Sequence, residues 1–243
     1  MPNENGEWIL YGLADNDPKR IKTWNALIKV IDKIGFLPLF ANQVEGFSVE
    51  EMTAATGWWS GDVKRDPWMW REIITESHQA VYGKFFDKKA GFMSLEWLPY
   101  FANWRRDGYD FDALWDDQKA SYRAKKIMDL FPEKPKTEWF SFEIKEKAGF
   151  GKGGLKNFDG VLTQLQMQTY LVPKEFRKRK NKKGEEYGWS IAVMATPESI
   201  WGKKIVRKAY KEDPEKSRER IFQQVKNCFP LAAESDIRKI LKP

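Results

Sequence analysis

The sequence is poor in the residues that build covalent and metal-bound sites. Its 243 residues contain one cysteine, Cys228, and one histidine, His78. A single cysteine excludes a disulfide within the chain, and the two residues together are too few for a cysteine- or histidine-based zinc site. The chain also lacks the Gly-Lys-Ser/Thr ending of a P-loop and a dinucleotide-binding fingerprint. We therefore expect no metal and no cofactor.

Long apolar runs are missing as well. No stretch approaches the roughly 20 apolar residues that cross a bilayer. The segment Met1–Glu7 has neither the basic start nor the apolar run of a signal peptide. We expect a cytoplasmic protein that does not enter a membrane, and the sequence sets no oligomeric state.

Aromatic residues and positive charge are abundant instead. The chain has 12 Trp, 16 Phe and 8 Tyr, most of which we expect in the core because each buries a large area. The formal net charge is +7, and residues 151–220 alone hold 17 Lys/Arg against 9 Asp/Glu. Such a local positive field attracts nucleic-acid phosphates or an anionic membrane surface, unless it is only a solvated face.

Capping signals predict the first helices. Asp17-Pro18 joins an N-cap residue to a proline at the first helical position, and apolar residues then recur at helical spacing up to Gly35. Ser48-Val49-Glu50-Glu51 is a capping box, which predicts a helix over 49–56.

The following segments predict a helix, a hairpin and a connector. Asp66-Pro67 opens a helix to about residue 78. Aromatic residues around a polar turn with glycine predict a β-hairpin within 80–97. Residues 99–118 are predicted to be a connector in which Arg105-Arg106-Asp107-Gly108 forms a turn.

The second half repeats this order of elements. The landmarks Leu39-Phe40, Phe47-Ser48 and Gly57-Trp58 recur about 92 residues later as Leu130-Phe131, Phe140-Ser141 and Gly149-Phe150. The predicted elements there are a helix over 111–130, a short helix over 142–148, a turn at 149–154, a helix capped by Asn157, and strands near 170–177 and 187–195.

Helix, turn, helix and β-hairpin is the order of a winged helix-turn-helix. We therefore predict a mainly α protein with small β-hairpins (α+β), built from tandem winged helix-turn-helix modules. The predicted domains are a first winged-helix module with an aromatic connector (17–118), a second with a basic wing (119–200) and a C-terminal helical segment (201–243).

A basic run marks the second predicted wing. Residues 177–183 hold six Lys/Arg in seven positions, and so many unpaired charges cannot be buried. A wing lies beside the DNA backbone, where such charges neutralise phosphates without reading sequence. A nuclear localisation signal is the alternative. The predicted DNA contacts here are Arg177, Lys178, Arg179, Lys180, Lys182 and Lys183.

The helix after the glycine loop is the predicted recognition helix. Its polar side presents Asn157, Gln164 and Gln168, whose amides can pair with adenine in the major groove. A merely polar helix face is the alternative. Lys152 and Lys156, in and just after the loop, complete the predicted DNA contacts, because a loop before a helix N-terminus can touch a DNA phosphate.

Three stretches together resemble one known family. Ile34–Phe40, Tyr82–Pro99 and Leu155–Pro197 are similar to the segment after the first helix, the hairpin with its Leu-Pro, and the winged-helix unit of the AlkZ (YcaQ) type of DNA glycosylase. The order of parts from Trp24 to Trp201 resembles more closely the diverged AlkZ-related proteins. The resemblance implies this fold and binding of DNA.

The resemblance does not extend to the chemistry. The family's catalytic Gln-apolar-Gln/Asp falls on Pro38 and Phe40, and neither side chain can position a water or support an oxocarbenium-like sugar. We therefore expect a non-enzymatic or repair-associated protein that binds duplex DNA, with no catalytic residue. Two alternatives stay open. One is a glycosylase with a displaced catalytic residue, for which Asp32, Gln43 and Glu45 are the candidates, and the other is a protein–protein interaction module with an aromatic surface.

Overall fold

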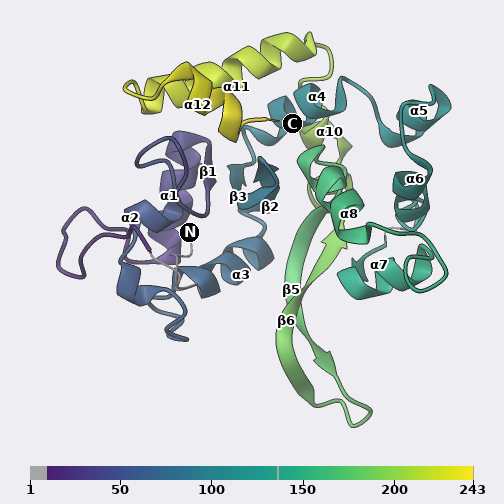
Figure 1. The fold of residues 1–243 in the computed structure, drawn as a ribbon, viewed down its shortest axis with the longest axis horizontal. Helices are drawn as coiled ribbons and strands as arrows, with labels where there is room; N and C mark the ends of the chain where they lie inside the picture. Colours follow the sequence, from purple (N-terminus) through teal and green to yellow (C-terminus); the bar gives the residue numbers. More distant parts are fainter. Residues whose placement is uncertain (1–9, 136, 243) are drawn as a thin grey trace.

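The computed structural model describes residues 10–135 and 137–242 (Figure 1). Helices alternate with two small three-stranded antiparallel sheets. The first part contains α1 (Trp24–Ile34), β1 (Phe36–Pro38), α2 (Val49–Met52), a 3-10 turn (Ala55–Gly57), α3 (Pro67–Ser77), β2 (Ala80–Phe86), β3 (Lys89–Ser94) and α4 (Leu98–Arg106).

The second part has a similar order of elements, and the strands of its hairpin are longer. It contains α5 (Phe111–Asp116), α6 (Tyr122–Met128), β4 (Trp139–Phe140), α7 (Ser141–Lys147), α8 (Phe158–Met167), β5 (Val172–Lys180) and β6 (Glu186–Ala195). The last helices are α9 (Pro197–Trp201), α10 (Lys203–Val206), α11 (Pro214–Cys228) and α12 (Glu234–Ile240). Figure 1 shows α11 and α12, in yellow, returning to the side of the molecule that holds α1 and β1.

The two sheets share one strand order. In the first sheet β3 lies between β1 and β2, and in the second β6 lies between β4 and β5. All neighbouring strands are antiparallel. A helix, α3 or α8, leads into each hairpin. The predicted helix-then-hairpin order is confirmed at both places.

Caps and one glycine set the helix boundaries that the sequence predicted. Ser48 Oγ accepts a hydrogen bond from the Glu51 N–H at 3.1 Å, and the Asp66 carboxylate accepts one from the Trp68 N–H at 2.9 Å. Gly35 ends α1 with a φ of 98°, where a Cβ atom would lie 2.5 Å from Nε1 of Trp97. Only glycine tolerates both that φ and that close approach.

The first helix begins later than predicted. Asp17-Pro18 lies in a turn, and the Ile21 N–H donates to the carbonyl of Met52 at 2.8 Å. This long-range bond is part of a bridge between Ile21 and Thr53, so Thr23 caps α1 instead. The same bridge ends α2 at Met52, well before the predicted residue 56.

Two further helix predictions were wrong. The predicted connector contains α4, and Arg105 and Arg106 form its last turn, with the left-handed residue Asp107 (φ 52°) after it. The predicted helix over 111–130 is two helices, because Gln118 has a φ of 59° and Ser121 caps α6. Asn157 precedes α8, as predicted, but its side chain makes no capping hydrogen bond.

Two hydrophobic cores hold the molecule together. The first joins α1, the first sheet and α4 to the C-terminal helices, with Phe36, Phe86 and Phe101 buried beside Ile221 and Ile240. The second lies among α5–α8 and the base of the β5–β6 hairpin. Burial of the phenylalanines is consistent with the expected role of most aromatic residues.

A buried arginine joins the two parts. Arg106, at the end of α4, donates to Glu198 at 2.5 Å, to the Tyr210 hydroxyl at 3.0 Å and to the Thr169 carbonyl at 2.6 Å. Its guanidinium also lies 4.7 Å from the Tyr170 ring centroid. These contacts fix the end of α8 and the start of α9 relative to the first part.

Candidate nucleic-acid interface

The predicted wing corresponds to the β5–β6 hairpin, which projects from the rest of the molecule (Figure 1), and we call this hairpin the wing. Strand β5 continues to Lys180, beyond the predicted end at residue 177, because Arg179 and Lys180 pair with Tyr187 and Glu186 of β6. Four of the six cations of the basic run therefore lie in a strand rather than in the turn. In the turn, Asn181 Oδ1 accepts the N–H groups of Lys183 at 2.9 Å and Glu185 at 3.1 Å.

The cations of the wing differ in how far they are already paired. Arg177 forms ion pairs with Glu138 and Glu175, and the Arg179 guanidinium lies 4.3 Å from the Phe142 ring centroid. Within the described residues, no ion pair involves Lys178, Lys180, Lys182 or Lys183, and all four are exposed. These four lysines are the charges most available to an anionic partner.

The wing also carries an exposed aromatic side chain that the site prediction did not include. Trp189 is 89% exposed, and Tyr187 is 49% exposed. The strand register shifts between Arg177 and Arg179, and Gly188 in β6 has a φ of 74°. This irregularity is a β-bulge, which redirects side chains out of the regular pleat. The same hairpin therefore carries an exposed indole and the four exposed lysines.

The predicted recognition helix packs against the first hairpin. The side-chain Oε1 of Gln166 accepts from the backbone N–H of Lys84 at 3.2 Å, and the Lys84 ammonium donates to Thr163 Oγ1 at 3.2 Å. This packing buries one side of α8. The opposite side, with Gln164, stays exposed.

A groove of about 670 Å³ lies between the β2–β3 turn, α8 and the end of α4. We call it the central groove. Its lining includes three residues of the predicted site, Asn157, Gln164 and Gln168, and three cations, Lys84, Lys88 and Arg105. Lys152 and Lys156 are exposed in the loop before α8 and do not line it. The structure thus brings the amide residues together with cations that the sequence did not single out.

A second, smaller groove of about 380 Å³ separates the two sheets. Arg71 of α3 lies on its wall with its guanidinium 3.9 Å from the Trp68 ring and 4.3 Å from the Phe176 ring. The same guanidinium donates to Glu72 at 2.8 Å. This arginine holds α3 against the base of the wing.

The positions of the family's catalytic motif are apolar and enclosed. Pro38 is buried in β1 opposite Gly91. The Phe40 ring centroid lies 5.3 Å from that of Trp58 and 6.5 Å from those of Trp59 and Trp68. An aromatic cluster therefore surrounds Phe40, one of the two positions to which the resemblance assigns the family's catalytic motif.

The three displaced candidates lie outside both grooves. Asp32, Gln43 and Glu45 are exposed, and none lines the central or the smaller groove. Partial burial, followed by the charge of Glu96, raises the pKa of Asp32. The buried carboxylate nearby is Glu50, which accepts the N–H groups of Tyr11 at 2.7 Å and Ala41 at 2.9 Å. Those bonds give Glu50 a structural role.

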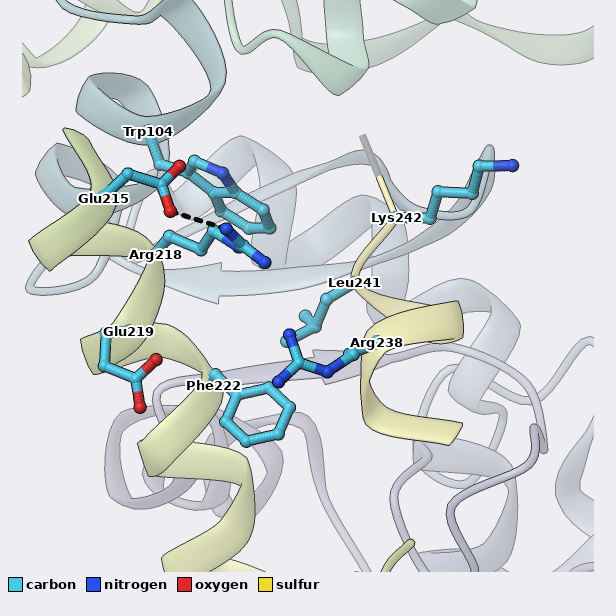
Figure 2. A pocket seen from close by; sticks show the side chains of 8 residues that line it. All are labelled: Trp104, Glu215, Arg218, Glu219, Phe222, Arg238, Leu241 and Lys242. Atoms are coloured by element: carbon cyan, nitrogen blue, oxygen red, sulfur yellow. Dashed lines mark hydrogen bonds and ion pairs between the residues drawn. The ribbon is translucent and has the colours of Figure 1, made fainter. Parts of the chain in front are cut away.

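A third pocket, of about 340 Å³, lies between α4, α11 and α12 (Figure 2). Glu215 and Arg218 form an ion pair at 2.5 Å on one wall, and Arg238 lies 4.8 Å from the Phe222 ring centroid on the other. Lys242 points away from these side chains in Figure 2. The charges on the walls are largely satisfied by their neighbours.

A sequence profile of the AlkZ-related family matches residues 21–242. The chain belongs to the AlkZ-related family. Membership of the AlkZ-related family links this chain to DNA repair and to a glycosylase-like fold. No curated protein and no solved structure is significantly similar to the chain.

Membrane-spanning helices and metal-binding clusters are both absent from the part of the chain that the structure describes. No helix there is both long and apolar enough to span a membrane. No group of three or more His, Cys, Asp and Glu side chains in the same ranges is placed to hold a metal ion.

Proposed function

We propose that this AlkZ-related protein binds duplex DNA through tandem winged helix-turn-helix modules and does not excise bases. The observation that carries the proposal is the projecting wing with its four unpaired lysines and exposed Trp189. Such a surface offers phosphate neutralisation and one ring for stacking.

The repeated architecture supports the tandem arrangement. Each part has a helix, a short strand, a short helix, a second helix and a hairpin, and each short strand pairs with the second strand of its hairpin. The first hairpin is short and largely buried, whereas the second is long and charged. The second module therefore makes most of the DNA contacts in this proposal.

Binding is expected to depend mainly on the phosphate backbone. Packing against β2 leaves α8 only one free side, with Gln164 exposed and Gln168 half-buried. Few base edges are within reach of so small a surface, whereas phosphate contacts are the same at every sequence. We expect similar affinity for unrelated duplexes.

The test replaces Lys178, Lys180, Lys182 and Lys183 by Gln and measures duplex binding by fluorescence anisotropy over a range of salt concentrations. Each phosphate that the variant no longer neutralises should lower the slope of log K against log salt by up to about one unit. The slope and the affinity should fall alike for unrelated sequences.

The matched control removes the same charge elsewhere. Lys22, Lys29, Lys216 and Lys239 are also exposed, and they lie before or on α1, α11 and α12, away from the wing. Their replacement by Gln should change binding much less. Equal reductions of affinity in both proteins would mean that net charge, not the wing, attracts DNA. Absence of salt-dependent binding in the unmodified protein would favour a protein–protein module.

A further inference from the structure

The central groove contains a buried cation with open donors. Arg105 is only 7% exposed. Its Nη2 donates to the Leu241 carbonyl at 2.6 Å and to the Phe85 carbonyl at 3.3 Å. Its Nε and Nη1 atoms are buried and make no hydrogen bond. An arginine normally uses all its donors when it is buried, because unpaired buried polar groups are costly.

No counter-charge accompanies this guanidinium. Among the described residues no carboxylate forms an ion pair with Arg105, and the guanidinium lies 4.2 Å from the Trp104 ring centroid and 6.0 Å from that of Phe101. Burial lowers the pKa of Arg105 to about 9. By contrast Arg106, the next residue, pairs with Glu198. Arg105 therefore lacks the anion that its neighbour has.

The rest of the groove favours the same kind of ligand. Lys84 and Lys88 stand on the lining with Arg105, against one carboxylate, Asp159. The first turn of α8, a helix of ten residues, also faces the groove at Gly160, and helix N-termini attract anions. The amides of Asn157, Gln164 and Gln168 add hydrogen-bond donors without negative charge.

We propose that the central groove binds a phosphate group, with Arg105 as the buried anchor and Lys84 and Lys88 as the neutralising cations. The guanidinium suits an oxyanion because its charge is fixed and its N–H groups donate charge-assisted hydrogen bonds, and Nε and Nη1 are the donors without a partner here. A phosphate of the DNA backbone and a free phosphorylated compound share this chemistry. The identification of the phosphate as part of the DNA backbone rests on the proposed function. The phosphate site itself does not depend on DNA binding.

The first arm of the test uses inorganic pyrophosphate and thermal unfolding. Pyrophosphate should raise the unfolding midpoint of the unmodified protein, since a ligand that binds only the folded state stabilises it. Lys88 is exposed and has a left-handed backbone (φ 65°) that asparagine also accepts, so Lys88→Asn removes the charge without strain. Lys88→Asn and Arg105→Gln should reduce the shift, Lys88→Arg should keep it, and Lys29→Gln should leave it unchanged.

The second arm measures duplex DNA binding with the same variants. Lys88→Asn should weaken binding about tenfold, the order expected when one hydrogen bond to a charged group is removed. Pyrophosphate should also compete with DNA. If pyrophosphate stabilises the protein but DNA binding ignores both pyrophosphate and Lys88→Asn, the site takes a free phosphorylated compound.

The two proposals fail separately. Absence of any DNA binding would overturn the proposed function and leave the pyrophosphate arm intact. If Lys88→Asn and Arg105→Gln behave like Lys29→Gln in both arms while the wing variant no longer binds DNA, the phosphate site is wrong. The Lys88→Asn variant still decides whether the phosphate site exists if the Arg105→Gln variant does not fold.

Discussion

Trp189 is almost fully exposed, and it follows an irregular backbone position in β6. Its 89% exposure means that folding gains almost nothing from the indole. Trp189 follows Gly188, which has a positive φ, in the hairpin that also carries Lys178 and Lys180. An exposed large aromatic among cations is suited to stacking on a base or sugar.

We expect Trp189→Ala to leave the unfolding midpoint unchanged and to weaken DNA binding about tenfold, the size of one base–aromatic stack. Anisotropy titrations at fixed salt measure the affinity. Leu231→Ala, at an apolar residue that is fully exposed near α12, is the control and should change neither quantity. Unaltered affinity in the Trp189 variant would remove the indole from the interface.

Gly35 offers a second test at the residue scale. A methyl group there meets both a left-handed backbone and the Trp97 ring. We expect Gly35→Ala to lower the free energy of unfolding by about 3 kcal/mol. Gly108 has a φ of 73° with nothing within 4 Å, so Gly108→Ala isolates the backbone effect at about 1 kcal/mol. Urea denaturation compares them, and equal decreases would show that Trp97 gives way.

At the scale of elements, local chemistry was predictable and long-range partners were not. Ser48 and Asp66 identify their helices because a cap needs only neighbours in sequence. The hydrogen bond from the Ile21 N–H to the Met52 carbonyl makes α1 begin later than predicted, and the residues near Ile21 in sequence do not indicate this bond. The polar run that contains Arg106 and ends in Asp107-Gly108 has the composition of a turn. Arg106 is nevertheless buried in a helix, because it pairs with Glu198, which is 92 residues away in sequence.

The dependence on long-range contacts also explains which residues of the candidate site could be predicted from the sequence. The basic run and the amides of α8 were visible in the sequence because composition alone marks them. Arg105 was not, since its burial depends on Phe85 and Leu241, which lie far from it in sequence. Trp189 lies in a strand that the sequence predicts, but its outward position follows only from the irregular strand register in the structure.

The Arg106–Glu198 pair joins α4 to α9, and it predicts a pH effect. Burial alone would raise the pKa of Glu198, but the charge and hydrogen bond of Arg106 outweigh it and hold that pKa below the ordinary 4.5. A carboxylate with a depressed pKa stabilises the fold fully above the ordinary value, and this stability is lost as the pH falls through its folded-state pKa.

We expect Glu198→Gln to lower the free energy of unfolding by about 3 kcal/mol at pH 7, because it leaves Arg106 buried without its partner. The difference from the unmodified protein should shrink as the pH falls from the ordinary value of 4.5 through the lower pKa of folded Glu198, because the carboxyl then becomes neutral. Urea denaturation at a series of pH values measures both. A difference that stays constant with pH would contradict the assignment.

At the scale of the whole molecule, the central question is whether bases leave the DNA. Excision needs a flipped base and groups that support the departing base and a water. Here the motif positions hold Pro38, buried and without an N–H, and Phe40, inside an aromatic cluster. Neither Pro38 nor Phe40 has a side chain that can act as an acid or a base.

We therefore expect no release of alkylated purines from duplex DNA under conditions where a glycosylase of the family is active. Chromatography of the released bases is the measurement. Robust release that disappears on changing Asp32, Gln43 or Glu45 singly would instead establish a displaced catalytic residue. Release unaffected by all three would point to a group outside these candidates.

The shared first core has a consequence for the order in which the chain matures during synthesis. That core needs residues from both ends, Ile31 and Phe101 together with Ile221 and Ile240, whereas the second core uses only residues 111–194. The second core can thus close while α11 and α12 are still being translated. The first core, although it contains the residues translated first, is therefore completed last, after the second core has formed.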